Sequence, residues 1–232
     1  CYPEKGPLTN YIGFSHDCNF QSIQNLTSTQ KTIISYGIAD ALRVIHHQGY
    51  QFGNVNAVNV YLDSNFHPLL TNFFGIKNIK DFYGHSKSSN DIKFNEFYLK
   101  IDVYSYSIIY AALIEPIELN PPANSAKEFY QRLACRERPV CKKATKKQRE
   151  ILDLMWNCIP KNRINFDQVI ENFNNGNLIF PDTEMDEFER YKKFINNICI
   201  QNKKVEENNP KILETDNFDN NQNEQENKRT RN

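Results

Sequence analysis

An apolar segment near the middle of the chain constrains the fold more than any other feature of the sequence. Residues 101–114, IDVYSYSIIYAALI, are apolar on nearly every helical face and carry one charge, that of Asp102. A helix that is apolar all round is buried on all sides, so the segment predicts the inner helix of a domain. At about 14 residues it is too short to cross a bilayer, and we expect no membrane association. In its first turn Asp102 would be favoured by the helix dipole, and a buried acid there needs hydrogen-bond donors.

Composition and charge exclude several classes of function. The 232 residues include 28 Lys and Arg and 28 Asp and Glu, so the net charge is zero and nothing favours nucleic acid or an anionic surface as a partner. The six cysteines form no CxxC pair and no dense disulfide framework, which is typical of reduced thiols and indicates a cytoplasmic protein. The chain starts with Cys1 rather than Met, and we expect it to be a fragment of a longer polypeptide.

Periodicity and turn residues predict a mainly α-helical domain with one short β-hairpin. A long helix is expected to begin after an N-cap at Ser28 or Thr29. Alternating apolar residues at 58–62, a turn at 63–65 and further apolar residues at 69–70 are typical of a hairpin.

Capping residues mark three helices in the second half of the chain. Thr145 and Gln148 form a capping box, and Asn165 opens the next helix. Thr183 is expected to cap a last, amphipathic helix.

The sequence divides into three parts. Residues 1–175 contain the periodic apolar segments and form the predicted domain, and residues 176–201 form an amphipathic helical extension. Residues 202–232 are rich in Asn, Glu and Lys with almost no apolar side chains, and we expect them to be disordered.

Several stretches of the chain keep the order and spacing of a known family. They are YQFGNVNAVNVYLD at 50–63, PLLTNFFG at 68–75, DVYSY at 102–106 and MWNCIPKNRINF at 155–166. Together these resemble the catalytic loop, metal-binding loop, central helix and "CW…P..RP.F" segment of protein kinases, especially of the tyrosine-kinase-like branch. The resemblance covers about residues 1–175 and implies the large C-terminal lobe of a protein kinase, with the small lobe missing from this fragment.

The resemblance places neutral amides at the catalytic positions. Asn54 stands where the family has the aspartate that accepts the substrate proton, and Asn56 stands at the loop lysine. Asn59 matches the Mg²⁺-binding asparagine, and Asn72 replaces the aspartate of the metal-binding D-F-G motif. In the alternative register, 73–75, a phenylalanine replaces that acid. An amide is neither basic nor anionic, so both functions are degenerate here.

Other positions implied by the resemblance concern the nucleotide and the architecture. Tyr61 would lie beneath the adenine ring, where the family has a smaller aliphatic residue, and would crowd it. Phe52 and Phe73 occupy two positions of the internal hydrophobic spine. Asp102 is expected to accept backbone N–H groups of the loop at 52–54.

Arg163 matches the arginine that pairs in the family with a glutamate at the end of the activation segment. Asn90 stands at the counted position of that glutamate, with Asp91 beside it. The resemblance therefore leaves the partner of Arg163 open.

These residues favour a pseudokinase that acts as a scaffold or allosteric partner of other proteins, with no cofactor. The alternative is an active Ser/Thr or Tyr kinase that uses Mg-ATP and atypical catalytic residues. That alternative needs a substitute acid, and Asp63 is the only one at 50–75, in the predicted turn. A third alternative, an unrelated helical interaction protein, requires the registered motifs to be a coincidence.

Overall fold

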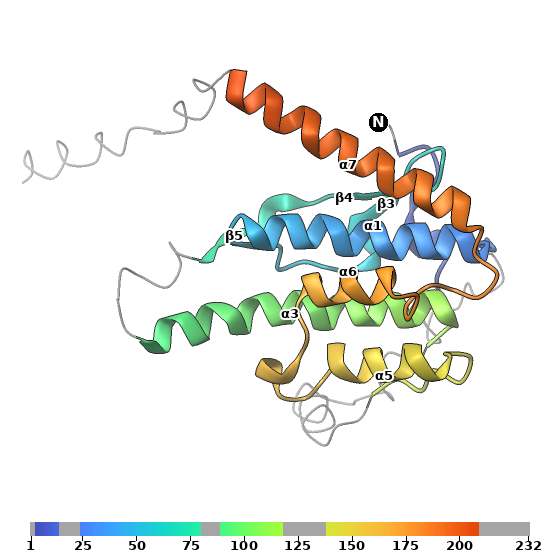
Figure 1. Ribbon diagram of the computed structural model, residues 1–232. Helices are drawn as coiled ribbons and strands as arrows, with labels where there is room; N and C mark the ends of the chain where they lie inside the picture. The colour runs from blue at the N-terminus through green and yellow to red at the C-terminus, as the bar shows by residue number, and fades with distance from the viewer. Residues whose placement is uncertain (1–2, 14–23, 80–88, 118–137, 209–232) are drawn as a thin grey trace, which may run out of the picture. The chain divides into compact units, whose positions relative to one another are not determined.

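The computed structural model describes residues 3–13, 24–79, 89–117 and 138–208. The chain divides into two units, Cys1–Phe188 and Glu189–Asn232. In its described part the first unit is mainly helical, with two small antiparallel sheets (Figure 1). The fold class predicted from the sequence, a mainly α-helical kinase-like large lobe with a short hairpin, is confirmed.

Helix α3, Ser89–Ile114, is the central helix of the first unit. It packs against α1, Ser28–His47, and against α5, Lys146–Met155 (Figure 1). Helix α6, Phe166–Asn174, packs on α1. The predicted inner helix therefore has neighbours on several sides.

Two buried tyrosines of α3 have their hydroxyl groups satisfied by backbone carbonyls. Tyr106 and Tyr110 are fully buried. Their hydroxyl groups donate to the carbonyls of Ser35, at 3.1 Å, and of Leu178, at 2.8 Å. Burial raises the pKa of both tyrosines, so each hydroxyl keeps the proton that it donates.

Helix α3 is longer than predicted, and this corrects two expectations. It begins at Ser89, so Asp102 lies in its middle and not in its first turn, and the helix dipole does not explain the acid there. Within it, Phe97–Ile114 is long and apolar enough to cross a membrane by length and composition, the one such helix among the described residues. More than half of that stretch is buried, as expected for the core helix of a folded domain.

Helix α1 begins where predicted but with a different cap. Thr27 is the N-cap, and its hydroxyl accepts the N–H of Gln30 at 3.1 Å. The side-chain oxygen of Gln30 accepts the N–H of Thr27 at 2.9 Å, which completes a capping box. Thr29 instead accepts the N–H of Glu184 at 2.9 Å, so the hydroxyl ties two distant segments together.

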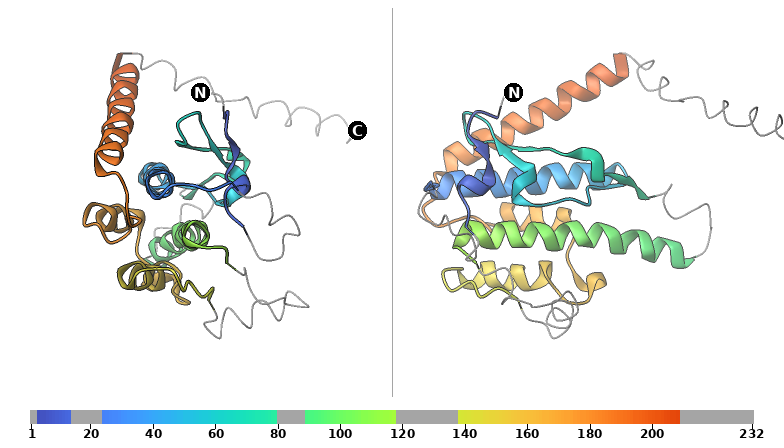
Figure 2. Two further views of the ribbon diagram at one scale, coloured as in Figure 1. Left: turned by 90° about the vertical axis from the view of Figure 1, so that its right-hand side faces the viewer. Right: turned by 180° about the vertical axis from the view of Figure 1, so that it is seen from behind.

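The predicted hairpin is present. Strand β3, Val60–Leu62, pairs antiparallel with β4, Pro68–Leu70, with Val60 opposite Leu70. Strand β1, Gly6–Pro7, pairs with the other edge of β3. Figure 2 shows these strands on one side of α1, against which β4 packs.

A second strand pair was not predicted. Strand β2, Tyr50–Gln51, pairs antiparallel with β5, Lys77–Asn78. Strands of two residues are too short to show alternation in a sequence. The described residues also contain short 3-10 helices: η1, Leu8–Asn10; η3, Ala57–Asn59; η4, Phe73–Gly75; and η5, Pro160–Asn162.

The capping box predicted at Thr145 and the helix start predicted at Asn165 are both confirmed. Thr145 and Gln148 exchange side-chain bonds at the start of α5. Asn165 and Gln168 do the same at the start of α6.

Helix α7, Met185–Asn208, differs from the prediction at both ends. The hydroxyl of Thr183 donates to the carbonyl of Phe180 at 2.7 Å, and Glu184 supplies the first helical carbonyl, which accepts the N–H of Phe188. The predicted Thr183 cap is therefore wrong. The helix continues to Asn208, past the predicted start of the disordered tail, and residues 209–232 lie outside the described residues.

Candidate functional site

The predicted catalytic positions lie in two segments that the strands bring together. Residues 52–59 follow β2, and residues 72–75 follow β4. The pairing of β2 with β5 and of β3 with β4 holds these segments side by side. Thr71 strengthens the contact, because its N–H and its hydroxyl both donate to the carbonyl of Asn59, at 2.9 and 3.1 Å.

Four asparagines in these segments form a chain of hydrogen bonds, which we name the amide network. The side chain of Asn56 donates to the side-chain oxygen of Asn54 at 2.8 Å, and the side chain of Asn59 donates to the carbonyl of Asn54 at 2.9 Å. The side chain of Asn72 donates to the side-chain oxygen of Asn59 at 3.3 Å. Asn56 also accepts the N–H of Asn59 at 3.1 Å. Three side chains of the loop and that of Asn72 are thus linked by hydrogen bonds.

The amide network offers nothing that suits a magnesium ion. Mg²⁺ in proteins is bound through carboxylates, and all four members here are neutral. The side-chain oxygens of Asn54 and Asn59 each already accept a hydrogen bond from a neighbouring amide. Among the residues that the structure describes, no three His, Cys, Asp or Glu side chains cluster as metal ligands. The residues present therefore do not fit the metal that the fold family implies.

The nearest acid in sequence, Asp63, is engaged in the hairpin turn. One oxygen of its carboxylate accepts the N–H of Asn65 and the N–H of His67, both at 2.8 Å. Its side chain is largely buried. An acid held in this way stabilises the turn. Strand β3 separates Asp63, which follows it, from Asn59 of the amide network, which precedes it.

A buried carboxylate on α3 holds the start of the loop. Asp102 is 1% exposed, and its two oxygens accept the N–H of Phe52 at 2.8 Å and the N–H of Gly53 at 2.9 Å. The side chain of His46, at the end of α1, lies 2.9 Å from the oxygen that Phe52 uses. We name Asp102, His46 and the two N–H groups the loop anchor. Charge-assisted bonds of this kind are stronger than those between neutral groups.

His46 is the member of the loop anchor that sequence reasoning missed. His46 lies in the last turn of α1, where a histidine is also favoured by the helix dipole. It also follows Ile38 and Leu42 at steps of four residues, on the face of α1 that is buried. A histidine on a buried helical face needs a hydrogen-bond partner, and that pattern could have indicated one.

The structure leaves no room for a side chain at Gly53. Its φ angle is +74°, in the left-handed region that favours glycine. A Cβ atom built on Gly53 would lie 2.9 Å from the carbonyl oxygen of Gly75. The loop at 52–59 and the 3-10 helix η4 therefore approach each other closely at Gly53 and Gly75.

The aromatic residues of the site differ in burial. Phe52 is fully buried, and its ring meets that of Phe73 edge to face with centroids 5.5 Å apart. Phe73 is 53% exposed and Phe74 is fully exposed. Tyr61 is half-buried in β3, between Pro7 and Leu69 on the neighbouring strands.

Arg163 is held by groups other than an acid. Its guanidinium donates to the carbonyls of Asn157, at 2.8 Å, and Lys100, at 2.9 Å. It also lies over the ring of Tyr104, 5.0 Å from the ring centroid. Asn90 and Asp91, the residues counted as its family partner, have side chains outside the described part of the chain.

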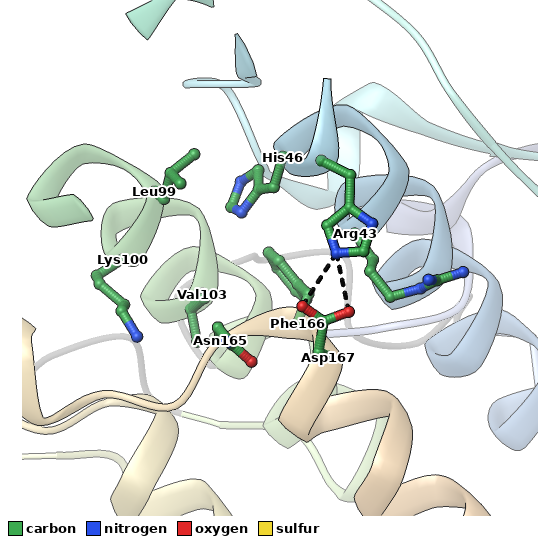
Figure 3. Close-up of a pocket in the computed structure, with 9 residues that line it drawn as sticks. Arg43, His46, Leu99, Lys100, Val103, Asn165, Phe166 and Asp167 are labelled. Atoms are coloured by element: carbon green, nitrogen blue, oxygen red, sulfur yellow. Dashed lines mark hydrogen bonds and ion pairs between the residues drawn. The ribbon is translucent and has the colours of Figure 1, made fainter. Parts of the chain in front are cut away.

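A pocket of about 160 Å³ lies behind the loop anchor, where α1, α3 and α6 meet. In Figure 3, His46 stands at one wall, with Leu99 and Val103 of α3 and Phe166 of α6 around it. The rings of His46 and Phe166, which both line the pocket, meet edge to face with centroids 5.0 Å apart. A second histidine, His47, pairs with Asp167 at the surface of this pocket.

A comparison with protein-family models identifies the family of the chain. The family model of protein tyrosine and serine/threonine kinases matches residues 2–173. The chain belongs to the protein tyrosine and serine/threonine kinase family. No curated protein sequence matches the chain.

Proposed function

We propose that this member of the kinase family transfers no phosphate and works through its surface, as a scaffold or allosteric partner of other proteins. One observation carries the proposal: the positions of the catalytic aspartate, the loop lysine and the metal-binding aspartate hold three members of the amide network. Asn54, Asn56 and Asn72 bond to each other or to Asn59 in place of substrate, phosphate and metal.

The first argument concerns the proton. Phosphotransfer to a hydroxyl group needs an acceptor for its proton, and a neutral amide at position 54 is not a base. Loss of a general base slows a reaction typically ~10²–10⁴-fold. That factor corresponds to about 3–5 kcal/mol of activation free energy. The oxygen of Asn54 is moreover already paired with Asn56.

The second argument concerns the metal. An ion that prefers anionic oxygen meets only Asn59 and Asn72, and these two side chains bond to each other. Tyr61 adds bulk where the family has a smaller side chain beneath the adenine ring. Weak Mg-ATP binding and absent chemistry thus have separate causes, which variants can separate.

The contacts that hold the loop in place favour a function in binding other proteins. The loop anchor holds residues 52 and 53 by charge-assisted bonds, and Phe52 packs against Phe73. A loop that is held in place without its catalytic groups is suited to presenting a surface.

The test restores the lost groups one at a time in the full-length protein. Asn72→Asp together with Tyr61→Leu is expected to raise Mg-ATP affinity, measured by calorimetry with and without Mg²⁺. Asp at position 72 keeps the backbone, because Asp like Asn tolerates the φ of +62° found there. Phosphotransfer, measured as incorporation of labelled phosphate, is expected only when Asn54→Asp is added.

Phosphate incorporation by the unsubstituted parent protein is the decisive measurement. We expect no Mg²⁺-dependent incorporation of phosphate by the parent. Incorporation that is abolished by Asn59→Ala would overturn the proposal in favour of an active kinase with atypical residues.

A further inference from the structure

A groove of about 450 Å³ lies outside the amide network and the loop anchor, between α5 and residues 138–142. One wall is formed by Arg149, Leu152 and Asp153 of α5 and by its C-cap residue Trp156. Leu152 and Asp153 each lie three or four residues from Arg149 and from Trp156, so the four lie along one side of the helix. Its volume is in the range of about 300–1,000 Å³ that is usual for ligand pockets.

The charges around this groove do not balance. Three basic residues line it, Arg138, Lys142 and Arg149, against one acid, Asp153. The acid is engaged, because its carboxylate accepts the indole N–H of Trp156 at 3.0 Å. Lys142 and Arg149 are exposed, and neither side chain has an ion pair or a hydrogen bond with any described residue. Lys142 and Arg149 therefore bring positive charge to the groove that no acid among the described residues pairs with.

The groove is also lined by apolar side chains. Leu152 and Trp156 are buried, at 0% and 5% exposure. Pro139 and Val140 line the groove as well, and Val140 is 73% exposed. Exposed apolar surface beside positive charge suits a ligand that is apolar at its centre and acidic at its ends.

We propose that this groove binds a segment of a partner protein in which one apolar side chain is flanked by acidic side chains. The apolar side chain contacts Val140 and Trp156, and the flanking carboxylates pair with Lys142 and Arg149. Arginine pairs with a carboxylate through two parallel N–H bonds, which adds geometric specificity. This binding would give the proposed scaffold role its kind of partner. Only the biological use of the groove rests on the proposed function, and the binding itself does not.

The probe is a short fluorescein-labelled peptide with one phenylalanine between pairs of glutamates, titrated with the full-length protein and followed by fluorescence anisotropy. We expect saturable binding that weakens as salt is raised, because exposed charge pairs are screened. Two comparison peptides separate the contributions. One replaces phenylalanine by glycine and the other replaces the glutamates by lysines, and both are expected to bind at least about tenfold more weakly.

Charge reversal on the protein gives the matched test. Arg149→Glu and Lys142→Glu are each expected to weaken binding of the acidic peptide about tenfold. Lys147→Glu is the control, because this substitution makes the same charge change. Lys147 is exposed on the same helix and does not line the groove. That variant is expected to bind as the parent does. Thermal unfolding of all three variants checks that the exposed substitutions leave the fold intact.

Three results would overturn this inference. They are no binding of the acidic peptide, equal binding of the lysine peptide, and equal losses for Lys147→Glu and Arg149→Glu. The measurement uses no nucleotide and no phosphotransfer. Failure here would therefore leave the proposed lack of catalysis untouched, and an active parent kinase would leave this groove untouched.

Discussion

Two sets of contacts hold residues 52–59, and they differ in charge. The loop anchor joins the ionisable pair Asp102 and His46 to backbone N–H groups, and Asp102 is 1% exposed. The amide network joins neutral side chains of the same loop to one another and to Asn72. The anchor binds backbone N–H groups, which every residue except proline supplies, whereas the network depends on the identity of its side chains. The comparison shows that the conformation of residues 52 and 53 can be held without any charged side chain in the amide network.

The largest expected effect is that of removing the anchor. Asp102→Ala leaves two backbone N–H groups and His46 without their acceptor, and each buried donor left without a partner costs about 1–3 kcal/mol. We expect this loss in the free energy of unfolding by urea. Asp102→Asn keeps one acceptor oxygen and is expected to lose less. An Ala variant as stable as the parent would show that α3 does not hold the loop.

The next effect concerns the close contact between the loop at Gly53 and η4 at Gly75. Gly53→Ala places a Cβ atom 2.9 Å from the carbonyl of Gly75 at a φ of +74°, and we expect a loss of about 2–3 kcal/mol in the free energy of unfolding. Gly176 is the matched control, because it has the same φ and no atom within 4 Å of the added Cβ. Gly176→Ala is expected to cost only about 1 kcal/mol. Equal losses for the two variants would mean that the backbone angle alone requires glycine at 53.

A smaller effect is expected within the amide network. Asn59→Ala removes the bonds to Asn54 and Asn72 and should lower the free energy of unfolding by about 1–2 kcal/mol. Asn174→Ala, on an exposed residue at the end of α6, is the control with no expected change. If Asn59→Ala cost as much as Asp102→Ala, the distinction between the charged anchor and the neutral network would fail.

The smallest effect separates two neighbouring aromatic residues. Phe73→Ala loses the edge-to-face contact with Phe52, which is typically worth about 0.5–1.5 kcal/mol. Phe74→Ala changes a side chain that is fully exposed, and its effect on unfolding in urea is expected to be negligible. A larger loss for Phe74→Ala than for Phe73→Ala would contradict the contact seen here.

Local interactions made part of this structure predictable from the sequence. The capping boxes at Thr145 and Asn165 depend on residues three apart, and the hairpin at 60–70 depends on a short turn. The apolar segment at 101–114 identified the core helix because a helix with no polar face has to be buried. The sequence alone also determined that the four members of the amide network carry no charge, because the identity of a side chain decides whether it can be ionised.

Only the tertiary structure decided how those positions are held. His46 meets Asp102 across 56 residues, and Gly53 meets Gly75 through backbone contact, which no local pattern encodes. The start of α3 at Ser89 and the partners of Arg163 were likewise missed, since each depends on which distant groups pack nearby. The physical reason is that burial and close approach depend on how segments fold onto one another, whereas caps, turns and side-chain charge are properties of neighbouring residues.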